Sequence, residues 1–258
     1  MMRYTIVFKA FFSLRAALQV LFLALSGGAR CIRCGAPCGA QQLCKRCLSS
    51  FYAYEPLFSP GARCTSCGKR LISEHEVCME CRKQPVLLHT DGVFPLHAYR
   101  FWNKTLLHEW KTGVARSLSP VFAKAVYQAL EALYQKVGAT IPVVPVPPRP
   151  GKVWQTGWDQ IAELTFLLRI TYGVPVCPLL RRTSVLQQKK LGRKERLSAL
   201  HSAYVCKSAY KDRKKPLPQA VVLLDDVLTT GATIESCARS LKACGVQTVY
   251  AITLFVVD

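Results

Sequence analysis

Acidic residues are scarce in this chain. Fifteen Asp and Glu stand against 35 Lys and Arg among 258 residues, which gives a formal net charge of +20. So large a basic excess favours anionic partners, namely phosphorylated metabolites, nucleic acid or an acidic membrane surface. The charge is concentrated between Arg181 and Lys215, where twelve Lys or Arg face only two acids. Such a run is also typical of a solvated loop, so the charge indicates the sign of a partner and not its identity.

A long, uninterrupted apolar run is also missing. The best candidate, Ala16–Leu25, is short and follows Lys9 and Arg15, which argues against a membrane-spanning helix. The run precedes a stretch of small residues and so imitates a signal peptide. We expect instead that residues 1–29 form an amphipathic helix, which packs on the protein or makes a peripheral contact with a membrane.

The pattern of a disulfide framework is absent, although cysteine is abundant. Nine of the 13 cysteines lie between residues 31 and 81, and eight of these form four C-x2-C pairs. That spacing lets two thiolates bind one metal ion from a tight turn, and disulfide frameworks rarely repeat it four times. The pattern therefore predicts zinc and a reducing, cytoplasmic compartment. The predicted ligands are Cys31, Cys34, Cys44, Cys47, Cys64, Cys67, Cys78 and Cys81.

Eight thiolates suffice for two closed sites, so we expect one or two structural zinc ions. The pairs can combine sequentially or in a cross-braced manner, and the short intervening loops favour the sequential arrangement. Cys38 is an additional thiol, which leaves the pairing open. The other cysteines are scattered in sequence and typical of small buried hydrophobes: Cys177, Cys206, Cys237 and Cys244.

Three segments are expected: a leading helix at 1–29, a small zinc-ribbon-like module at 30–85, and an α/β domain at 86–258. The module has little regular structure because metal replaces a core. In the α/β domain, alternating strands and helices predict a parallel, doubly wound sheet that binds ligands beyond the carboxyl ends of its strands. The expected strands are 93–99, 141–146, 174–177, 221–224 and 248–256, and the expected helices are 104–111, 120–136, 158–171 and 234–243.

The most specific motif follows the apolar strand 221–224. Asp225 and Asp226 come first, and Thr229-Thr230-Gly231-Ala232-Thr233 then leads into a helix. N–H groups at such a turn and helix start point at an anion, and carboxylates accept hydrogen bonds from sugar hydroxyls. The motif resembles the phosphoribosyl-pyrophosphate (PRPP) motif of type I phosphoribosyltransferases. In the alternative interpretation the threonines only cap the helix, which requires one hydroxyl and not three.

Two further segments supply cations for a pyrophosphate group. A rigid turn after the strand 141–146 contains Pro147, Pro148 and Arg149, although a proline-rich linker is the alternative. The basic segment that contains Lys189, Lys190 and Arg193 has the length and charge of a lid that excludes water. Any Mg²⁺ is expected to bridge PRPP oxygens near the two acids rather than fill an all-protein cage.

The order of these motifs resembles the ComF family of competence-associated, phosphoribosyltransferase-like proteins. It comprises the leading apolar helix, the cysteine pairs, the Val-Pro-Val-Pro turn, Gly157-x-Asp159-Gln160, the basic segment and the loop 225–233. Family members commonly have Asn-Gln where this chain has Asp159-Gln160. The resemblance implies a type I phosphoribosyltransferase fold, Asp225 and Asp226 as catalytic acids, and N-terminal zinc. It also implies a cytoplasmic role in handling transforming single-stranded DNA, with a competence helicase as partner.

Three functions stay open at this stage. The first is DNA handling in natural competence by a PRPP-binding protein, the second is a phosphoribosyltransferase of nucleotide salvage, and the third is a non-catalytic PRPP sensor. No segment clearly reads a base, so no acceptor is predicted. Single-stranded DNA would meet the basic segment 189–215 and the zinc module. Four aromatic residues would then offer stacking surfaces, unless they belong to the core: Trp154, Trp158, Tyr204 and Tyr210.

Overall fold

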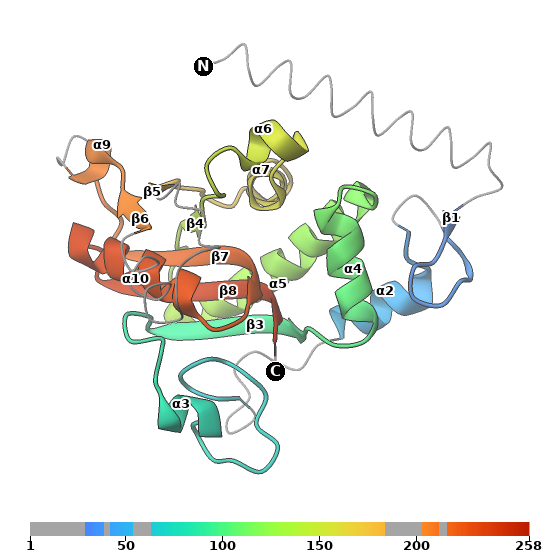
Figure 1. Cartoon of the computed structure of the whole chain (residues 1–258), viewed down its shortest axis with the longest axis horizontal. Coiled ribbons are helices and arrows are strands. Elements are labelled where there is room, and N and C mark those ends of the chain that lie inside the picture. The colour runs from blue at the N-terminus through green and yellow to red at the C-terminus, as the bar shows by residue number, and fades with distance from the viewer. Residues whose placement is uncertain (1–28, 39–41, 54–62, 184–202, 212–215, 258) are drawn as a thin grey trace, which may run out of the picture.

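A parallel sheet of four strands forms the centre of the molecule (Figure 1). The computed structural model describes residues 29–38, 42–53, 63–183, 203–211 and 216–257. The strand order is β3-β8-β7-β4, and every neighbouring pair is parallel. The strands are β3 (Gly92–Ala98), β4 (Val143–Pro145), β7 (Ala220–Leu228) and β8 (Thr248–Val256). The predicted α/β class with a parallel sheet is therefore confirmed.

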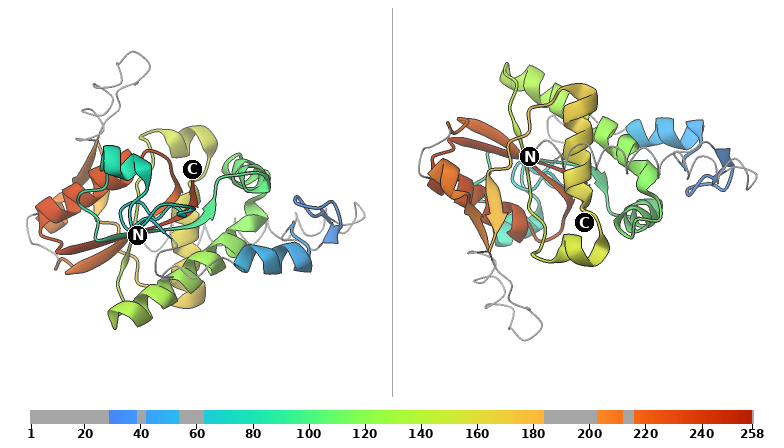
Figure 2. Two further views of the ribbon diagram at one scale, coloured as in Figure 1. Left: turned by 90° about the horizontal axis from the view of Figure 1, so that it is seen from below. Right: turned by 90° about the horizontal axis from the view of Figure 1, so that it is seen from above.

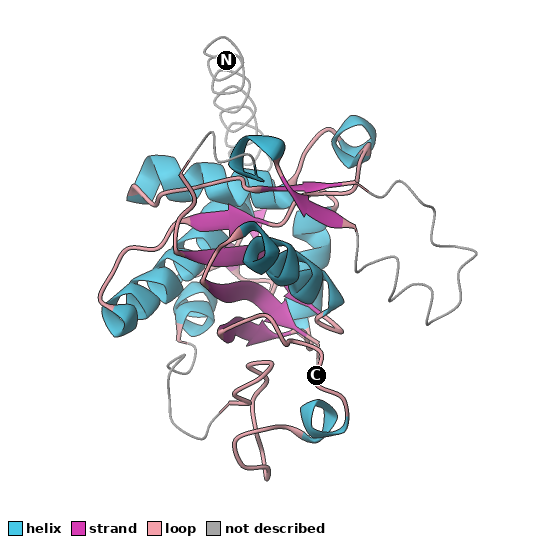
Figure 3. Ribbon diagram, turned by 90° about the vertical axis from the view of Figure 1, so that its left-hand side faces the viewer, coloured by secondary structure: helices cyan, strands magenta, loops and turns pink. Residues whose placement is uncertain are grey.

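Helices cover both faces of the sheet, as Figures 2 and 3 show. Because side chains alternate along a strand, Val222 and Leu224 pack with one helical layer, whereas Val221 and Leu223 pack toward α10. The first layer consists of α4 (Trp102–Lys111), the 3-10 turn η1 (Arg116–Leu118), α5 (Ser119–Val137) and α7 (Gln160–Tyr172). The opposite face is covered by α10 (Ala232–Cys244). The near-continuous apolar strands fit a sheet buried on both faces.

The structure differs from the predicted strands in two places, at the end of β7 and at the expected strand 174–177. β7 stays paired with β8 as far as Leu228, whereas its pairing with β4 stops at Leu224. Asp225 and Asp226 therefore lie inside β7, and the prediction that the strand ends before them is wrong on the β8 side. The expected strand 174–177 is reduced to one parallel bridge between Val176 and Val143.

A small antiparallel pair stands over α10. It joins β5 (Leu180–Arg182) to β6 (Tyr204–Cys206) and is followed by α9 (Ser208–Lys211). The Ser240 hydroxyl of α10 donates to the Tyr204 carbonyl at 2.6 Å, which fixes β6 on this helix. The basic residues Lys189, Lys190 and Arg193 lie outside the described residues, as does the leading apolar segment. No helix of the described part of the chain is long and apolar enough to cross a membrane.

The cysteine-rich region contains little regular structure, as the sequence predicts. Its elements are β1 (Ala29–Arg30), β2 (Pro37–Cys38), α2 (Lys45–Tyr52) and α3 (Met79–Lys83). In Figure 1, α2 lies beside α4 and α5. The helix α3 lies below the edge strand β3, away from α2. The division of the chain at residues 29 and 85 stays a prediction.

Candidate functional site

The eight predicted zinc ligands form two groups of four. Cys31, Cys34, Cys44 and Cys47 make the first cysteine group, and Cys64, Cys67, Cys78 and Cys81 make the second. Within each group the sulfur atoms all lie within 4.8 Å of one another, with Cys34–Cys44 at 3.6 Å and Cys67–Cys78 at 3.7 Å. Zinc with four bonds of about 2.3 Å separates its sulfurs by about 3.8 Å. Both groups can therefore hold zinc, and the grouping is the sequential one.

Backbone N–H groups prepare one thiol of each group for ionisation. Burial opposes ionisation of Cys31, but N–H donors from Cys44 and its own turn outweigh it and lower its pKa to about 6. The same balance lowers the pKa of Cys64 to about 7. Cys38 belongs to neither group, and burial together with the neighbouring thiols raises its pKa. Burial and the neighbouring thiols also raise the pKa of Cys47, a member of the first group, to about 12. Cys38 is therefore set apart by its position outside the four sulfurs, and not by its pKa.

Asp225 and Asp226, the two acids predicted to bind sugar hydroxyls, lie in β7 directly after its pairing with β4 ends. The Asp226 Oδ2 atom pairs with Lys111 Nζ of α4 at 3.0 Å. The Asp225 Oδ1 atom accepts the Asp226 N–H at 2.8 Å. Burial, the charge of Asp226 and the charge of Asp159 raise the pKa of Asp225 to about 8. One acid of the pair is therefore compensated by a cation, and the other is held protonated near neutral pH.

The loop between β7 and α10 has the form of an anion cradle. Its Gly231 occupies the N-cap of α10 with a left-handed φ of 80°. The left-handed conformation favours glycine, and a Cβ atom there would lie 3.2 Å from the Leu87 side chain, which is a tight contact. Thr229 and Thr230 are exposed, and Thr233 is half-buried. Glycine holds the N-cap, and the Thr230 hydroxyl accepts the Ala232 N–H at 3.5 Å, so one of the three threonines makes a long contact of the capping kind.

Glu235 holds the segment 87–89, which lies against Gly231 of the cradle. This role is not evident from the sequence. Glu235 lies in the first turn of α10 and is 5% exposed. Its Oε2 accepts the N–H groups of Leu88 and His89 at 2.8 and 3.1 Å, and its Oε1 contacts His89 Nδ1 at 2.5 Å. Leu87, which packs on Gly231, is thereby fixed by a carboxylate that is 146 residues away from His89 in sequence.

The predicted pyrophosphate turn lies next to these acids. The Val146 N–H donates to the Leu224 carbonyl at 3.0 Å, so the turn leaves the sheet beside Asp225. Pro147 and Pro148 are half-buried, and Arg149 is exposed. This meeting of the two loops at one sheet edge was expected from the parallel topology and is confirmed.

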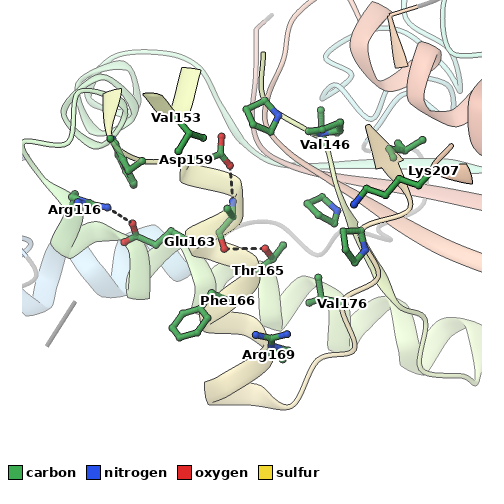
Figure 4. A pocket seen from close by; sticks show the side chains of 18 residues that line it. Arg116, Val146, Val153, Asp159, Glu163, Thr165, Phe166, Arg169, Val176 and Lys207 are labelled. Carbon is green, nitrogen blue, oxygen red and sulfur yellow. Dashed lines mark hydrogen bonds and ion pairs between the residues drawn. The ribbon is translucent and has the colours of Figure 1, made fainter. Parts of the chain in front are cut away.

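A cavity of about 520 Å³ opens beside the same turn (Figure 4). Pro147, Pro148 and Leu180 contribute to its apolar lining, and Asp159 lies at its rim. Arg169 on α7 and Lys207 after β6 line opposite sides (Figure 4). The cavity adjoins the turn that leaves β4, since Pro145 and Val146 also line it. Its walls come from segments far apart in sequence, so no local motif could reveal it.

The Gly157-x-Asp159-Gln160 motif connects the helices around the site. Asp159 caps α7 by accepting the Ala162 N–H at 2.7 Å. Gln160 accepts from Lys152 and donates to the Lys111 carbonyl at 3.2 Å. Lys152 opens the short helix α6 (Lys152–Thr156) and also pairs with Asp159 at 3.4 Å. The motif therefore holds the backbone of Lys111, whose ammonium group compensates Asp226.

The candidate stacking aromatics divide into buried and accessible residues. Trp158 and Tyr204 are 5% and 2% exposed, and Trp158 packs edge-on against Trp110. These two belong to the core. Tyr210 is half-buried, whereas Trp154 on α6 is 96% exposed. Of the four, Trp154 is the one that offers a free ring.

The comparisons with known proteins give one distant similarity over most of the chain. The chain is similar to Competence protein F of Haemophilus influenzae, with 24% identity over 227 residues. The aligned region covers 84% of this chain and 93% of that protein, so the distant similarity extends over most of the chain. No protein-family model matches the chain.

Proposed function

We propose that this chain binds PRPP and acts in natural competence, as a ComF-like protein that handles single-stranded DNA in the cytoplasm. The observation that carries the PRPP assignment is the glycine-capped start of α10 beside Asp225 and Asp226. A 5-phosphate would accept N–H groups of the loop 229–233, with the threonine hydroxyls as further donors. The two acids would receive the ribose hydroxyls.

The same edge of the sheet suits the rest of the ligand. Arg149 and the backbone of the 147–148 turn would face the pyrophosphate, and Lys189, Lys190 and Arg193 would approach from the basic segment. Magnesium would bind to PRPP oxygens and neutralise their charge. Zinc would fold the N-terminal region through the two cysteine groups and would not take part in any reaction.

The competence role rests on the similarity to Competence protein F and on the charge of +20. Single-stranded DNA needs cations along its backbone and ring surfaces for its bases. Arg149 and the exposed ring of Trp154 lie within five residues of each other on the turn and α6. We propose that this surface and the basic segment contact the strand.

Calorimetric titration with PRPP and magnesium tests the ligand. The double variant Asp225→Asn/Asp226→Asn should lose measurable PRPP binding and keep its fold. A matched control, Glu109→Gln/Glu131→Gln, removes the same charge from α4 and α5 and should bind as the wild type does. Unchanged affinity in the first variant would remove PRPP from the proposal.

Fluorescence anisotropy with labelled oligonucleotides tests the partner. Affinity for single strands should exceed that for duplex and should fall steeply with salt, because bound cations release counterions. Trp154→Ala should weaken binding by roughly tenfold, since base stacking contributes about 1–3 kcal/mol. Absence of binding at low salt would leave the metabolite role alone.

A catalytic phosphoribosyltransferase is the second candidate, and the cavity beside the 147–148 turn favours it. An apolar cavity of about 520 Å³ next to the proposed pyrophosphate site is large enough for an acceptor base. Incubation of the protein with PRPP, magnesium and each common base separates the candidates, since only the enzyme releases pyrophosphate.

A further inference from the structure

Three cysteines outside the zinc groups gather between β6, α10 and the start of the β5 hairpin. Cys177, Cys206 and Cys244 are all half-buried, so of the four cysteines expected to be small buried hydrophobes only Cys237 is fully buried. The Cys206 thiol lies close enough to the thiols of Cys244 and Cys177 for both to raise its pKa. Cys177 in turn donates to the Tyr210 hydroxyl at 3.6 Å.

The register of β6 on α10 explains the contact between Cys206 and Cys244. Ser240 and Cys244 are one helical turn apart and share a face of α10, and Ser240 binds the Tyr204 carbonyl at 2.6 Å. Tyr204 and Cys206 are two residues apart and so share a side of β6. The Tyr204 side chain faces α10, where it interacts with Thr233 and Cys237. Cys206 therefore faces the same helix one turn farther along.

A metal site is the alternative use of three thiols. Within the part of the chain that the structure describes, only the first and second cysteine groups bring three or more ligand atoms within 4.8 Å of one another. The third thiol thus lies too far away for a closed three-thiolate site, which favours chemistry of two thiols.

We propose that Cys206 and Cys244 form a thiol–disulfide site, which reacts with a small-molecule disulfide and closes a cross-link between β6 and α10. This inference does not depend on the proposed function. Both thiols are partly accessible, unlike the fully buried Cys237. They also lie on two elements that already touch through Ser240, so closure requires little movement of the backbone.

The exchange proceeds in two balanced steps. The Cys244 thiolate attacks one sulfur of the small disulfide, which forms a mixed disulfide and releases one thiolate. Cys206 loses its proton and attacks Cys244 Sγ of that mixed disulfide, which forms the cross-link and releases the second thiolate. Burial and the Cys244 thiol raise the pKa of Cys206 to about 12, so Cys206 keeps its proton while Cys244 attacks first. Once Cys244 is part of the mixed disulfide, its charge no longer opposes ionisation of Cys206.

The cross-link would reach the cradle through one strand. Tyr204, two residues before Cys206, interacts with Thr233 at the start of α10. A disulfide would fix both ends of this contact, so hydrogen exchange in β6 and in the first turn of α10 should slow down. The redox state of the thiol pair would thereby set the rigidity of the loop that holds the threonines.

The test uses the full zinc-loaded chain treated with oxidised glutathione and mapped by proteolysis and mass spectrometry without reduction. The expected product is a Cys206–Cys244 cross-linked peptide, with two thiols lost per chain, zinc retained and the unfolding midpoint raised by about 5 °C. The variant Cys244→Ser should form no cross-link, and the control Cys237→Ala should form it normally. A stable glutathione adduct on either cysteine, a Cys177–Cys206 link, or no reaction would each overturn the proposal.

Discussion

The first cysteine group packs against the helical layer and the last residues of β3, whereas the second packs against the middle of β3 and leads into the segment beside the cradle. Phe51 of α2 follows the first group and lies 5.7 Å from Phe122 of α5 and 5.9 Å from Trp102 of α4, and it stacks on His97 of β3 at 4.1 Å. Arg63 precedes the second group and donates to the Pro95 carbonyl of β3 at 2.9 Å. Two groups of four cysteines each therefore stabilise different parts of the domain.

The second group also continues directly into the proposed binding site. The chain leaves α3 at Lys83, reaches Leu87 beneath Gly231, and is held by Glu235 at Leu88 and His89. A metal ion in this group would order the chain that lies against the cradle. From the difference between the groups we infer that the first serves stability and the second serves both stability and ligand binding.

The largest expected difference concerns the glycines of the two metal turns. Both have left-handed φ, 73° at Gly35 and 70° at Gly68. A Cβ at Gly35 meets no atom within 4 Å, but at Gly68 it would lie 2.2 Å from the Val93 carbonyl oxygen. Gly35→Ala should lower the free energy of unfolding by about 1–2 kcal/mol, and Gly68→Ala by about 3 kcal/mol or more.

Denaturant unfolding of the zinc-loaded variants measures this difference. Zinc content should stay at about two ions per chain in Gly35→Ala. Equal losses of stability in the two variants would show that the second turn is not pressed against β3.

The next difference concerns ligand binding. Cys34 is exposed and Cys81 is half-buried, so each is the most accessible member of its group. Both Cys34→Ser and Cys81→Ser should lose one zinc ion. Only Cys81→Ser should weaken PRPP binding, by roughly tenfold, because about 1.4 kcal/mol of cradle order is lost.

Calorimetry on both variants, together with hydrogen exchange of the first turn of α10, checks this prediction. The exchange measurement needs no ligand, so it tests the contact even if PRPP is not bound. Faster exchange of this turn in Cys34→Ser than in Cys81→Ser would reverse the comparison.

The local parts of this arrangement could be predicted from the sequence. C-x2-C spacing determines which thiols can share an ion, and the periodic apolar runs place β8 at 248–256 as observed. The parallel topology brings the 147–148 turn beside Asp225. Each of these features depends on residues close in sequence or on a rule of chain connection.

Contacts between distant segments could not be predicted in this way. Glu235 looks like an ordinary acid in a first helical turn, and only the fold brings His89 to it. The pairing of Lys111 with Asp226 and the meeting of Cys206 with Cys244 have the same origin. Such contacts depend on the register of packed elements, which no local pattern encodes.

Asp225 differs from the cysteine groups, because we expect it to bind the ligand but to lower the stability of the fold. Its pKa is raised from 3.8 to about 8, so between these values the folded state holds a proton that the unfolded state has lost. Stability should therefore fall as the pH rises from about 4 to about 8. Asp225→Asn should flatten this slope and gain on the order of 1–2 kcal/mol at pH 8.5, since each pKa unit corresponds to about 1.4 kcal/mol.

Thermal or denaturant unfolding in magnesium-free buffer at several pH values follows this slope. Glu131→Gln on α5 is the control and should keep the slope of the wild type. If Asp225→Asn were less stable than the wild type at pH 8.5, the carboxylate would be a supporting group and not a destabilising one.

The smallest expected effect concerns Cys38, the thiol beside the first group. It lies outside the four sulfurs that approach within 4.8 Å, and burial and the neighbouring thiols raise its pKa. The four sulfurs of the first group already complete a closed tetrahedral zinc site, which leaves no position for a fifth thiol. Cys38→Ser should therefore retain about two zinc ions per chain and change the free energy of unfolding by less than about 1 kcal/mol. Cys44→Ser is the matched comparison and should lose one ion. Loss of zinc from Cys38→Ser together with full retention in Cys44→Ser would exchange the roles of the two thiols and redefine the first group.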